Sequence, residues 1–241
     1  MIKEFKDIKD DFQNEVGGKA FNLAKLKKFG LNVPNGFVVT DYAGTDSENE
    51  QIFNLFEKLK MTSVAVRSSA ICEDGSATSF AGQFETLLFV KKENLISSIQ
   101  TCMNSNQNEN AVYYAKSNNI SESDTKVSVV VQEMISSEYS GVLFTQNPIS
   151  DEDECLIECI KGVGEALVQG EITPSQIRLN KLNGEVLSYI GENFLRPEQI
   201  KELYDAGLHI EKCFGSPQDI EFAVENETLY IIQARPITTI Y

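Results

Sequence analysis

The chain has 241 residues, of which 41% are hydrophobic and 24% charged, so it can bury a substantial core as one large domain or two lobes. Its formal net charge of −15 and its pI of about 4.5 argue against nucleic acid or an anionic membrane as the partner. No apolar run is long enough to span a bilayer, and no apolar secretory segment is visible, so we expect a cytoplasmic protein.

The cysteines and the single histidine predict no catalytic site of their own. The five cysteines are odd in number and form no Cys-x-x-Cys motif, which favours reduced thiols over a disulfide framework: Cys72, Cys102, Cys155, Cys159 and Cys213. We expect Cys155 and Cys159 to be buried strand residues. His209 lies inside a predicted helix without a nucleophile or metal ligands nearby in the sequence, so we interpret it as a structural or surface residue.

The first half of the chain predicts short strands mixed with helices. A helix runs from about residue 17 to 29 and stops at Gly30, because apolar residues there recur at helical spacing. The segment 68–83 is rich in Ser, Gly, Ala and Thr and is interpreted as a long loop of the functional or disordered kind. The other predicted elements are strands at 37–40, 63–67 and 84–90 and helices at about 52–59 and 94–103.

The second half of the chain is richer in strands. An amphipathic helix spans about 197–214 and ends at Gly215. Helices mixed with antiparallel pairs are typical of an α+β protein rather than of an alternating doubly wound sheet. The predicted strands are 127–132, 141–145 and 155–160, followed after the helix by 219–223 and 230–236, which a polar turn at 224–229 joins.

The last two strands place their polar side chains on one face. Side chains alternate along a strand, so Asp219 and Glu221 share a face, as do Gln233 and Arg235. An antiparallel register in phase with this alternation sets Glu221 beside Gln233 and Asp219 beside Arg235. The opposite, apolar face is expected to carry Ile220, Phe222, Ile232 and Ala234.

This polar hairpin has the composition of a nucleotide-phosphate site. A carboxylate and an amide can hold Mg²⁺ through oxygen ligands, and a neighbouring guanidinium can bind phosphate oxygens. The alternative is a solvent-facing hairpin that cross-strand pairs stabilise.

Two earlier cations are candidates for the same chemistry. Lys19 follows Gly17-Gly18 at a predicted helix start, where backbone N–H groups could meet a phosphate, although the spacing is not that of a P-loop. The alternative is a simple helix entry with a solvated lysine. Arg67 follows an apolar strand and precedes small residues, which favours a functional role over an exposed arginine on a surface loop.

Two further segments could border a nucleotide site. The strand 129–134 ends in Gln132, Glu133 and Met134, and could supply an adenine pocket, although it is equally an ordinary strand. Residues 158–165 form a glycine-rich turn that packing explains as well.

Taken in order, these segments resemble the N-terminal nucleotide-binding domain of phosphoenolpyruvate synthase, pyruvate phosphate dikinase and rifampicin phosphotransferase. The resemblance covers nearly the whole chain, in eight segments: 16–20, 31–40, 65–70, 79–86, 129–132, 140–145, 164–165, and 219–223 with 233–238. It implies that residues 1–241 form a single nucleotide-binding domain with an α+β, ATP-grasp-like fold. Two lobes, at about 1–125 and 126–241, would hold ATP in the cleft between them.

The resemblance also implies a role for each matching residue, with ATP and Mg²⁺ as cofactors. Lys19 and Arg67 match phosphate ligands and, with Arg235, would act in catalysis. Glu221 and Gln233 match metal positions. The remaining matches are Gly82 and Thr86 in a mobile loop over the triphosphate, Gln132 near the adenine end, and Asp219 among the metal and phosphate positions.

In the family, this domain passes a pyrophosphoryl or phosphoryl group from ATP to a histidine on a separate swivelling domain. The present chain has neither the swivel histidine motif nor a barrel for phosphoenolpyruvate, and it is shorter than the family between Lys19 and Arg67. The resemblance therefore implies a Mg-ATP-dependent phosphotransferase subunit that phosphorylates a histidine on a separate partner protein. The alternatives are a sensor or interaction module that binds ATP without turnover, and a kinase acting directly on a small molecule.

Overall fold

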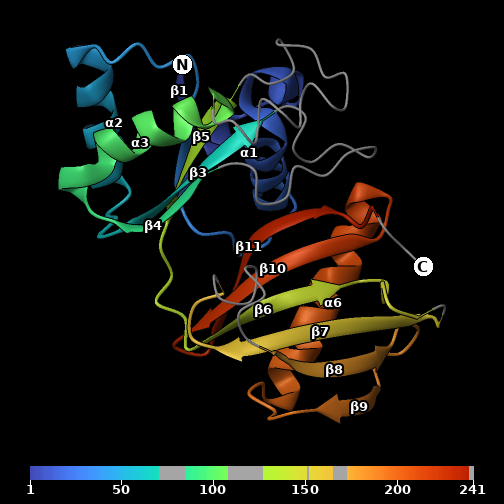
Figure 1. Ribbon diagram of the computed structural model, residues 1–241. Coiled ribbons are helices and arrows are strands. Elements are labelled where there is room, and N and C mark those ends of the chain that lie inside the picture. The colour runs from blue at the N-terminus through green and yellow to red at the C-terminus, as the bar shows by residue number, and fades with distance from the viewer. Residues whose placement is uncertain (71–84, 108–126, 151, 165–172, 239–241) are drawn as a thin grey trace. The chain divides into compact units, whose positions relative to one another are not determined.

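The computed structural model describes residues 1–70, 85–107, 127–150, 152–164 and 173–238 (Figure 1). The chain divides into two compact units. Unit 1 comprises residues 1–25 and 34–134, and unit 2 comprises residues 26–33 and 135–241. Each unit is built on one sheet, and every strand pairing in the described residues is antiparallel. The α+β class predicted from the sequence is therefore confirmed.

The sheet of unit 1 has five strands in the order β1-β2-β5-β3-β4. They are β1 (Ile2–Glu4), β2 (Gly36–Val39), β5 (Val127–Glu133), β3 (Val64–Ala70) and β4 (Thr86–Val90). The helices are α1 (Gln13–Lys28), whose last turn belongs to unit 2, α2 (Asp46–Lys58) and α3 (Leu95–Met103), with short 3-10 turns at Phe5–Asp7, Asp10–Phe12, Lys92–Asn94 and Asn104–Gln107.

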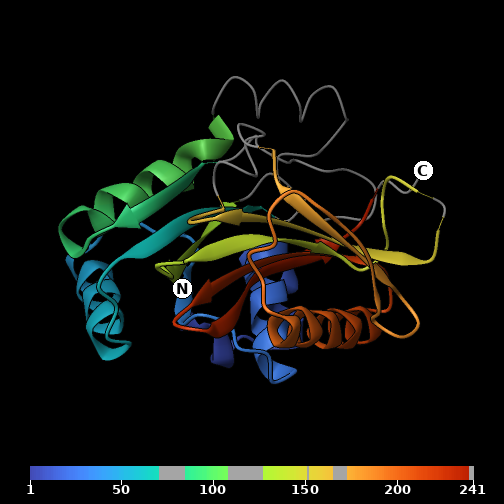
Figure 2. The ribbon, with the colours of Figure 1, turned by 90° about the horizontal axis from the view of Figure 1, so that it is seen from below.

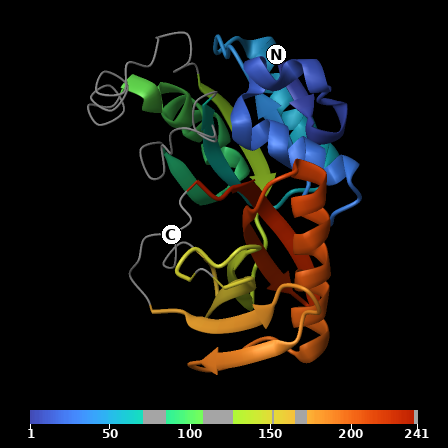
Figure 3. The ribbon, with the colours of Figure 1, turned by 90° about the vertical axis from the view of Figure 1, so that its right-hand side faces the viewer.

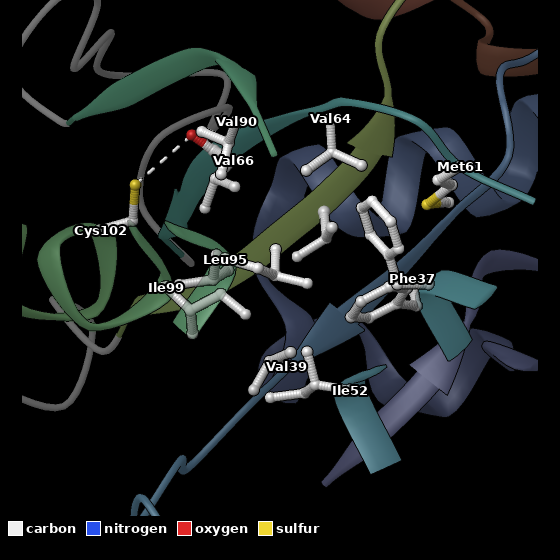
Figure 4. Close-up of a cluster of buried hydrophobic side chains, with 13 residues drawn as sticks. Phe37, Val39, Ile52, Met61, Val64, Val66, Val90, Leu95, Ile99 and Cys102 are labelled. Atoms are coloured by element: carbon white, nitrogen blue, oxygen red, sulfur yellow. Dashed lines mark hydrogen bonds between the residues drawn. The ribbon is translucent and has the colours of Figure 1, made fainter. Parts of the chain in front are cut away.

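One face of this sheet carries a cluster of buried hydrophobic side chains (Figure 4). Val64 and Val66 of β3 point to the same face because strand side chains alternate, and both are fully buried. Helix α2 adds Ile52 and Phe56, one turn apart, and α3 adds Ile99. The next residues of β3, Ala65 and Arg67, consequently lie on the opposite face.

Helix α2 begins where its sequence supplies a cap. The Thr45 side chain accepts a hydrogen bond from the Glu48 backbone N–H, and the Glu48 carboxylate accepts one from the Thr45 N–H at 3.0 Å. This reciprocal capping box satisfies two backbone donors that a helix start leaves open. It fixes the helix start at Asp46, six residues before the start expected from the apolar spacing.

The sheet of unit 2 has six strands in the order β11-β10-β6-β7-β8-β9. They are β6 (Tyr139–Phe144), β7 (Glu154–Lys161), β8 (Ser175–Asn180), β9 (Val186–Ile190), β10 (Gln218–Glu225) and β11 (Thr228–Pro236). The one long helix described in this unit, α6, spans Pro197–Phe214. It begins with proline in its first turn and ends at Gly215, whose left-handed φ of 77° suits glycine.

Helix α6 covers one face of the unit 2 sheet (Figure 2). Gly207 lies so close to β6 that an added Cβ would come within 2.4 Å of the Leu143 side chain. Leu143 pairs with Ile220 of β10 and Ile157 of β7, so these three buried side chains share the face toward α6. Asp219 and Glu221, which alternate with Ile220, therefore lie on the face away from the helix.

The structure corrects the predicted hairpin in two places. The strands continue through Val224 and Leu229, both buried, and only Asn226 and Glu227 form the turn, with φ of 48° and 66°. A β-bulge follows Glu221, so Ile231 rather than Ile232 pairs with Phe222 and is buried. The expectation that Ile232 shares the apolar face with Ala234 is wrong, because the bulge resets the alternation.

Three strands were not predicted: β1, β8 and β9. Strand β3 also runs through Ala70, so Ser68 to Ala70 are not part of a loop, and Arg67 lies inside the strand instead of at its end. Apart from the early start of α2, the remaining predicted helices and strands are confirmed within a few residues at each end.

Candidate functional site

The predicted register of the C-terminal hairpin is confirmed. Glu221 pairs with Gln233, and Asp219 pairs with Arg235, on the face of the unit 2 sheet away from α6. We call these four residues the hairpin cluster. The tight turn at Asn226 and Glu227 sets the pairing from Glu225 to Phe222, because two residues with positive φ match the twist of the flanking strands. The bulge after Glu221 then shifts the pairing by one residue and brings Glu221 opposite Gln233.

Asp219 and Arg235 form an ion pair in the hairpin cluster. The Arg235 Nε donates to Asp219 Oδ2 at 2.8 Å, and a second guanidinium nitrogen lies 2.8 Å from the same oxygen. Burial raises the pKa of Asp219 above its usual value, and the charges of Glu221 and Glu158 add to this, while Arg235 opposes it. The two contacts to Asp219 Oδ2 hold the Arg235 guanidinium in one orientation.

The side chain of Gln233 has the features of a ligand to a metal cation. Its side chain is 3% exposed, and its Oε1 is buried without a hydrogen-bond partner in the described part of the chain. A buried amide oxygen without a partner is unfavourable. A hard cation between this oxygen and the carboxylate of Glu221, its cross-strand neighbour, would satisfy it. The residues present therefore fit Mg²⁺.

The acidic face continues beyond the hairpin cluster, which the sequence analysis did not predict. Val142 of β6 pairs with both Glu221 and Glu158, so the two carboxylates share a face on either side of it. Gln176 Nε2 donates to Glu158 Oε1 at 2.8 Å. The missed signal was the alternation in β8, where Gln176 and Arg178 alternate with Ile177 and Leu179.

An ion pair follows on the same face. Arg178 of β8 donates to both carboxylate oxygens of Glu154, at 2.8 and 2.7 Å. This two-point contact is the main reason that the pKa of Glu154 lies below its usual value.

In unit 1, Lys19 is buried rather than solvated. Its side chain is 5% exposed, and its Nζ donates to the backbone oxygen of Ser68 at 2.7 Å. Helix α1 is interrupted just before it, at Gly17, with φ of 75° and ψ of 167°. A Cβ on Gly17 would lie 2.4 Å from the Ser69 backbone oxygen, so only glycine permits this approach. The alternative of a simple helix entry with a solvated lysine is wrong.

Serine hydroxyls hold the interrupted helix against the sheet. Ser69 Oγ donates to the Val16 oxygen at 3.0 Å and accepts from the Ala20 N–H at 3.1 Å. Ser128 of β5 also donates to the Val16 oxygen. Ser68 extends this connection, since its N–H donates to the Glu85 oxygen at 3.1 Å while its own oxygen accepts from Lys19.

The remaining unit 1 candidates lie on one face of the sheet. Arg67 is half-buried and pairs with the exposed Thr86 on one side and with Val130 on the other. Gln132 pairs with Ala65, two residues before Arg67, so it shares that face, and it is 2% exposed. The structure thus groups Arg67, Thr86 and Gln132, with Lys19 bound to the residue after Arg67. Gly82 lies outside the described residues.

Cys155, Cys159 and His209 lie where the sequence predicts them. Cys155 and Cys159 are buried strand residues, as predicted, and burial raises the pKa of each thiol to about 12. His209 lies exposed on α6, as predicted, with its Nε2 3.2 Å from the Phe29 oxygen. Among the described residues there is no group of three or more His, Cys, Asp and Glu residues that could hold a metal.

Among the described residues, no helix is both long enough and apolar enough to cross a bilayer.

The sequence matches one family and its relatives. Residues 45–193 and 190–241 match the family described as "Pyruvate phosphate dikinase, AMP/ATP-binding domain". The chain is 32% identical to a probable phosphoenolpyruvate synthase of Archaeoglobus fulgidus, over 93% of the chain and 40% of that protein. It is also 32% identical to the rifampicin phosphotransferase of Bacillus cereus, over the whole chain and 36% of that protein. It therefore spans well under half the length of both relatives.

The first of these matches extends over 300 aligned positions, more than the 241 residues of the chain, so the relative has segments that this chain lacks. Among solved structures, a dinucleotide-forming acetyl-coenzyme A synthetase of Ca. Korarchaeum cryptofilum is similar, with a TM-score of 0.48 and 11% identity over 91% of each chain. The match to the family covers most of the sequence, including all four residues of the hairpin cluster. The chain belongs to the pyruvate phosphate dikinase AMP/ATP-binding domain family, the nucleotide-binding family that it shares with phosphoenolpyruvate synthases and rifampicin phosphotransferases.

Proposed function

We propose that the chain is a Mg-ATP-dependent phosphotransferase subunit that transfers a phosphoryl or pyrophosphoryl group to a histidine on a separate protein. The observation that carries the proposal is the hairpin cluster. Its two cross-strand pairs supply oxygen ligands and an oriented guanidinium side by side, and the buried Gln233 oxygen has no partner among the described residues. Family membership supports ATP as the nucleotide.

Glu221 and Gln233 would hold the metal, which when bound neutralises negative charge on the phosphate oxygens. Arg235 would bind the phosphate group being transferred. Asp219 keeps the guanidinium in place through two contacts of 2.8 Å, so little reorganisation is needed as charge develops.

We also propose nucleotide-binding roles for residues of unit 1. We assign Lys19 and Arg67 to the phosphates, with catalytic roles, and Gly82 and Thr86 to nucleotide binding. Thr86, which the sequence placed in a mobile loop, is the first residue of β4. Gln132 is assigned to the adenine end. The support is positional, since Lys19 is bound to the backbone next to Arg67, and Thr86 and Gln132 lie on the Arg67 face.

The test uses purified protein with Mg²⁺ and ATP labelled separately at the β and γ positions, with and without an isolated swivel domain from a family member. Acid-labile label on the added domain is the expected result, and the released nucleotide, AMP or ADP, identifies the transferred group. ATP binding without cleavage in either condition would instead favour the sensor module. Turnover that a small metabolite stimulates, without a second protein, would favour the direct kinase.

Variants separate the site from the fold. Glu221→Ala and Arg235→Ala are expected to abolish label transfer while the protein stays folded by circular dichroism. Glu202→Ala and Arg196→Ala are matched controls, since Glu202 is exposed on α6 and Arg196 is half-exposed in a surface ion pair with Glu227. Full transfer activity in both site variants would refute the assignment.

A further inference from the structure

Exposed apolar side chains gather at one edge of unit 2. Seven large hydrophobic residues are exposed in the described part of the chain, and five of them lie between residues 182 and 190. They are Leu182, Val186, Leu187, Tyr189 and Ile190, with exposed fractions from 39% to 83%. Apolar side chains concentrated in this way mark an interaction surface more often than scattered ones do.

Strand β9, which carries four of these side chains, is the outermost strand of its sheet (Figure 3). It pairs with β8 on one side and with no other described strand on its outer side. Natural edge strands are usually protected by charged side chains, proline or a bulge. Val186–Ile190 has the sequence Val-Leu-Ser-Tyr-Ile, without charge or proline, and its one protective feature is a bulge at Leu187.

The match to the family model is divided into two stretches near the end of β9. Its two stretches, 45–193 and 190–241, overlap at residues 190–193, which begin at the last residue of β9. Because the aligned length with a relative exceeds the length of this chain, part of the family's sequence has no counterpart here. This break in the family match lies beside an apolar edge that nothing in the described residues covers.

We propose that β9 pairs with β9 of a second copy of this chain, antiparallel and about a two-fold axis at Ser188. In this register the apolar side chains on both sides of Ser188 face apolar side chains, since Val186 lies opposite Ile190 and Leu187 opposite Tyr189. Just outside the strand, Glu185 lies opposite Gly191, so like charges do not meet. The pairing joins two six-stranded sheets into one continuous sheet.

This proposal is independent of the phosphotransferase function, because β9 carries none of the site residues. Each copy has a formal net charge of −15, so the copies repel one another at long range. Salt screens that repulsion and leaves the apolar strand contact in place. The dimer should therefore become tighter as the salt concentration rises, which distinguishes it from a dimer held by ion pairs.

Cysteine crosslinking of the full chain tests the register. In an antiparallel pair, directly opposed Cα atoms lie about 4.5 to 5.5 Å apart, within the range that a disulfide spans. Ser188→Cys is expected to give a crosslinked dimer under mild oxidation. Leu182→Cys is the control, because that residue is more exposed but lies six positions from the axis. Native protein measures the background of its own thiols. Equal crosslinking of both variants would overturn the register.

Sedimentation velocity tests the association itself. Native protein of 26.9 kDa per chain should show a concentration-dependent doubling of mass that strengthens with salt. Tyr189→Lys should weaken dimerisation by about tenfold or more, since each dimer contains the change twice. Ile149→Lys, a change of equal charge at a residue 70% exposed elsewhere in unit 2, should leave it unaltered. A monomer at all concentrations and salt levels, without Ser188→Cys crosslinking, would overturn the proposal.

Discussion

Removing Arg235 should destabilise unit 2 through the carboxylate it leaves behind. Asp219 has a side chain 13% exposed, and Arg235 is 35% exposed. Breaking a fully buried pair costs about 3 to 5 kcal/mol, because an unpaired charge stays inside. Water partly screens the exposed arginine, so we expect Arg235→Ala to lower the free energy of unfolding by about 2 kcal/mol. Adding Asp219→Asn removes the stranded charge and should restore about half of this.

The same reasoning fixes the direction of a pH effect. Burial already raises the pKa of Asp219, and Arg235 opposes the rise, so its removal should raise the pKa further. A carboxyl with a raised folded-state pKa binds its proton more tightly when folded. Its stabilising contribution is therefore present at low pH and is lost as pH rises from the unfolded pKa through the folded one. The deficit of Arg235→Ala should shrink from pH 7 towards the ordinary carboxyl range near pH 4.

The assay is urea unfolding of native protein, both single variants and the double variant, at several pH values, followed by circular dichroism with a shared slope. Transfer activity measured in parallel should stay absent in the double variant although its stability recovers. The reasoning is refuted if the two single effects simply add at pH 7, or if the Arg235→Ala deficit grows as the pH falls.

Three further changes follow from local geometry. Gly141→Ala would place a Cβ 2.0 Å from the Glu158 backbone oxygen, so we expect a loss of about 3 kcal/mol or a failure to fold, checked by thermal unfolding. Gln233→Leu removes a buried oxygen without a partner and should raise the free energy of unfolding by about 1 kcal/mol while weakening Mn²⁺ binding in calorimetry; unchanged Mn²⁺ affinity would contradict the metal assignment. Thr45→Ala breaks the capping box of α2 and should cost about 1 kcal/mol in urea unfolding, whereas Thr101→Ala on α3 should cost less.

The hairpin register could be predicted because both strands carry alternating polar residues, and only one phase brings them together. The bulge could not, since Ile231 and Ile232 are equally apolar and either could face the core. The burial of Lys19 could not be predicted from the local sequence pattern either. Ser68, whose oxygen Lys19 binds, and Ser69 and Ser128, which donate to the Val16 oxygen, come from strands about 50 and 110 residues further along. Local spacing carries no information on such contacts.

Strand β8 was within reach, because Ile177 and Leu179 alternate with polar residues. Strand β9 was not, since four of its five side chains are apolar and exposed, which no periodicity rule assigns to an edge.

The hydrogen bonds of Ser68 make its amide signal sensitive to the position of Lys19. The Ser68 amide is bonded to the oxygen of Glu85, while its carbonyl receives the ammonium of Lys19, so a single residue connects the start of β4 with the buried cation. A shift of Lys19 toward an anion would lengthen its hydrogen bond to the Ser68 oxygen and change the polarisation of the hydrogen bond from the Ser68 N–H to Glu85. The Ser68 amide nitrogen resonance should therefore respond to nucleotide even though Ser68 itself need not touch it. If Lys19 does not contact the nucleotide, that signal should stay unchanged.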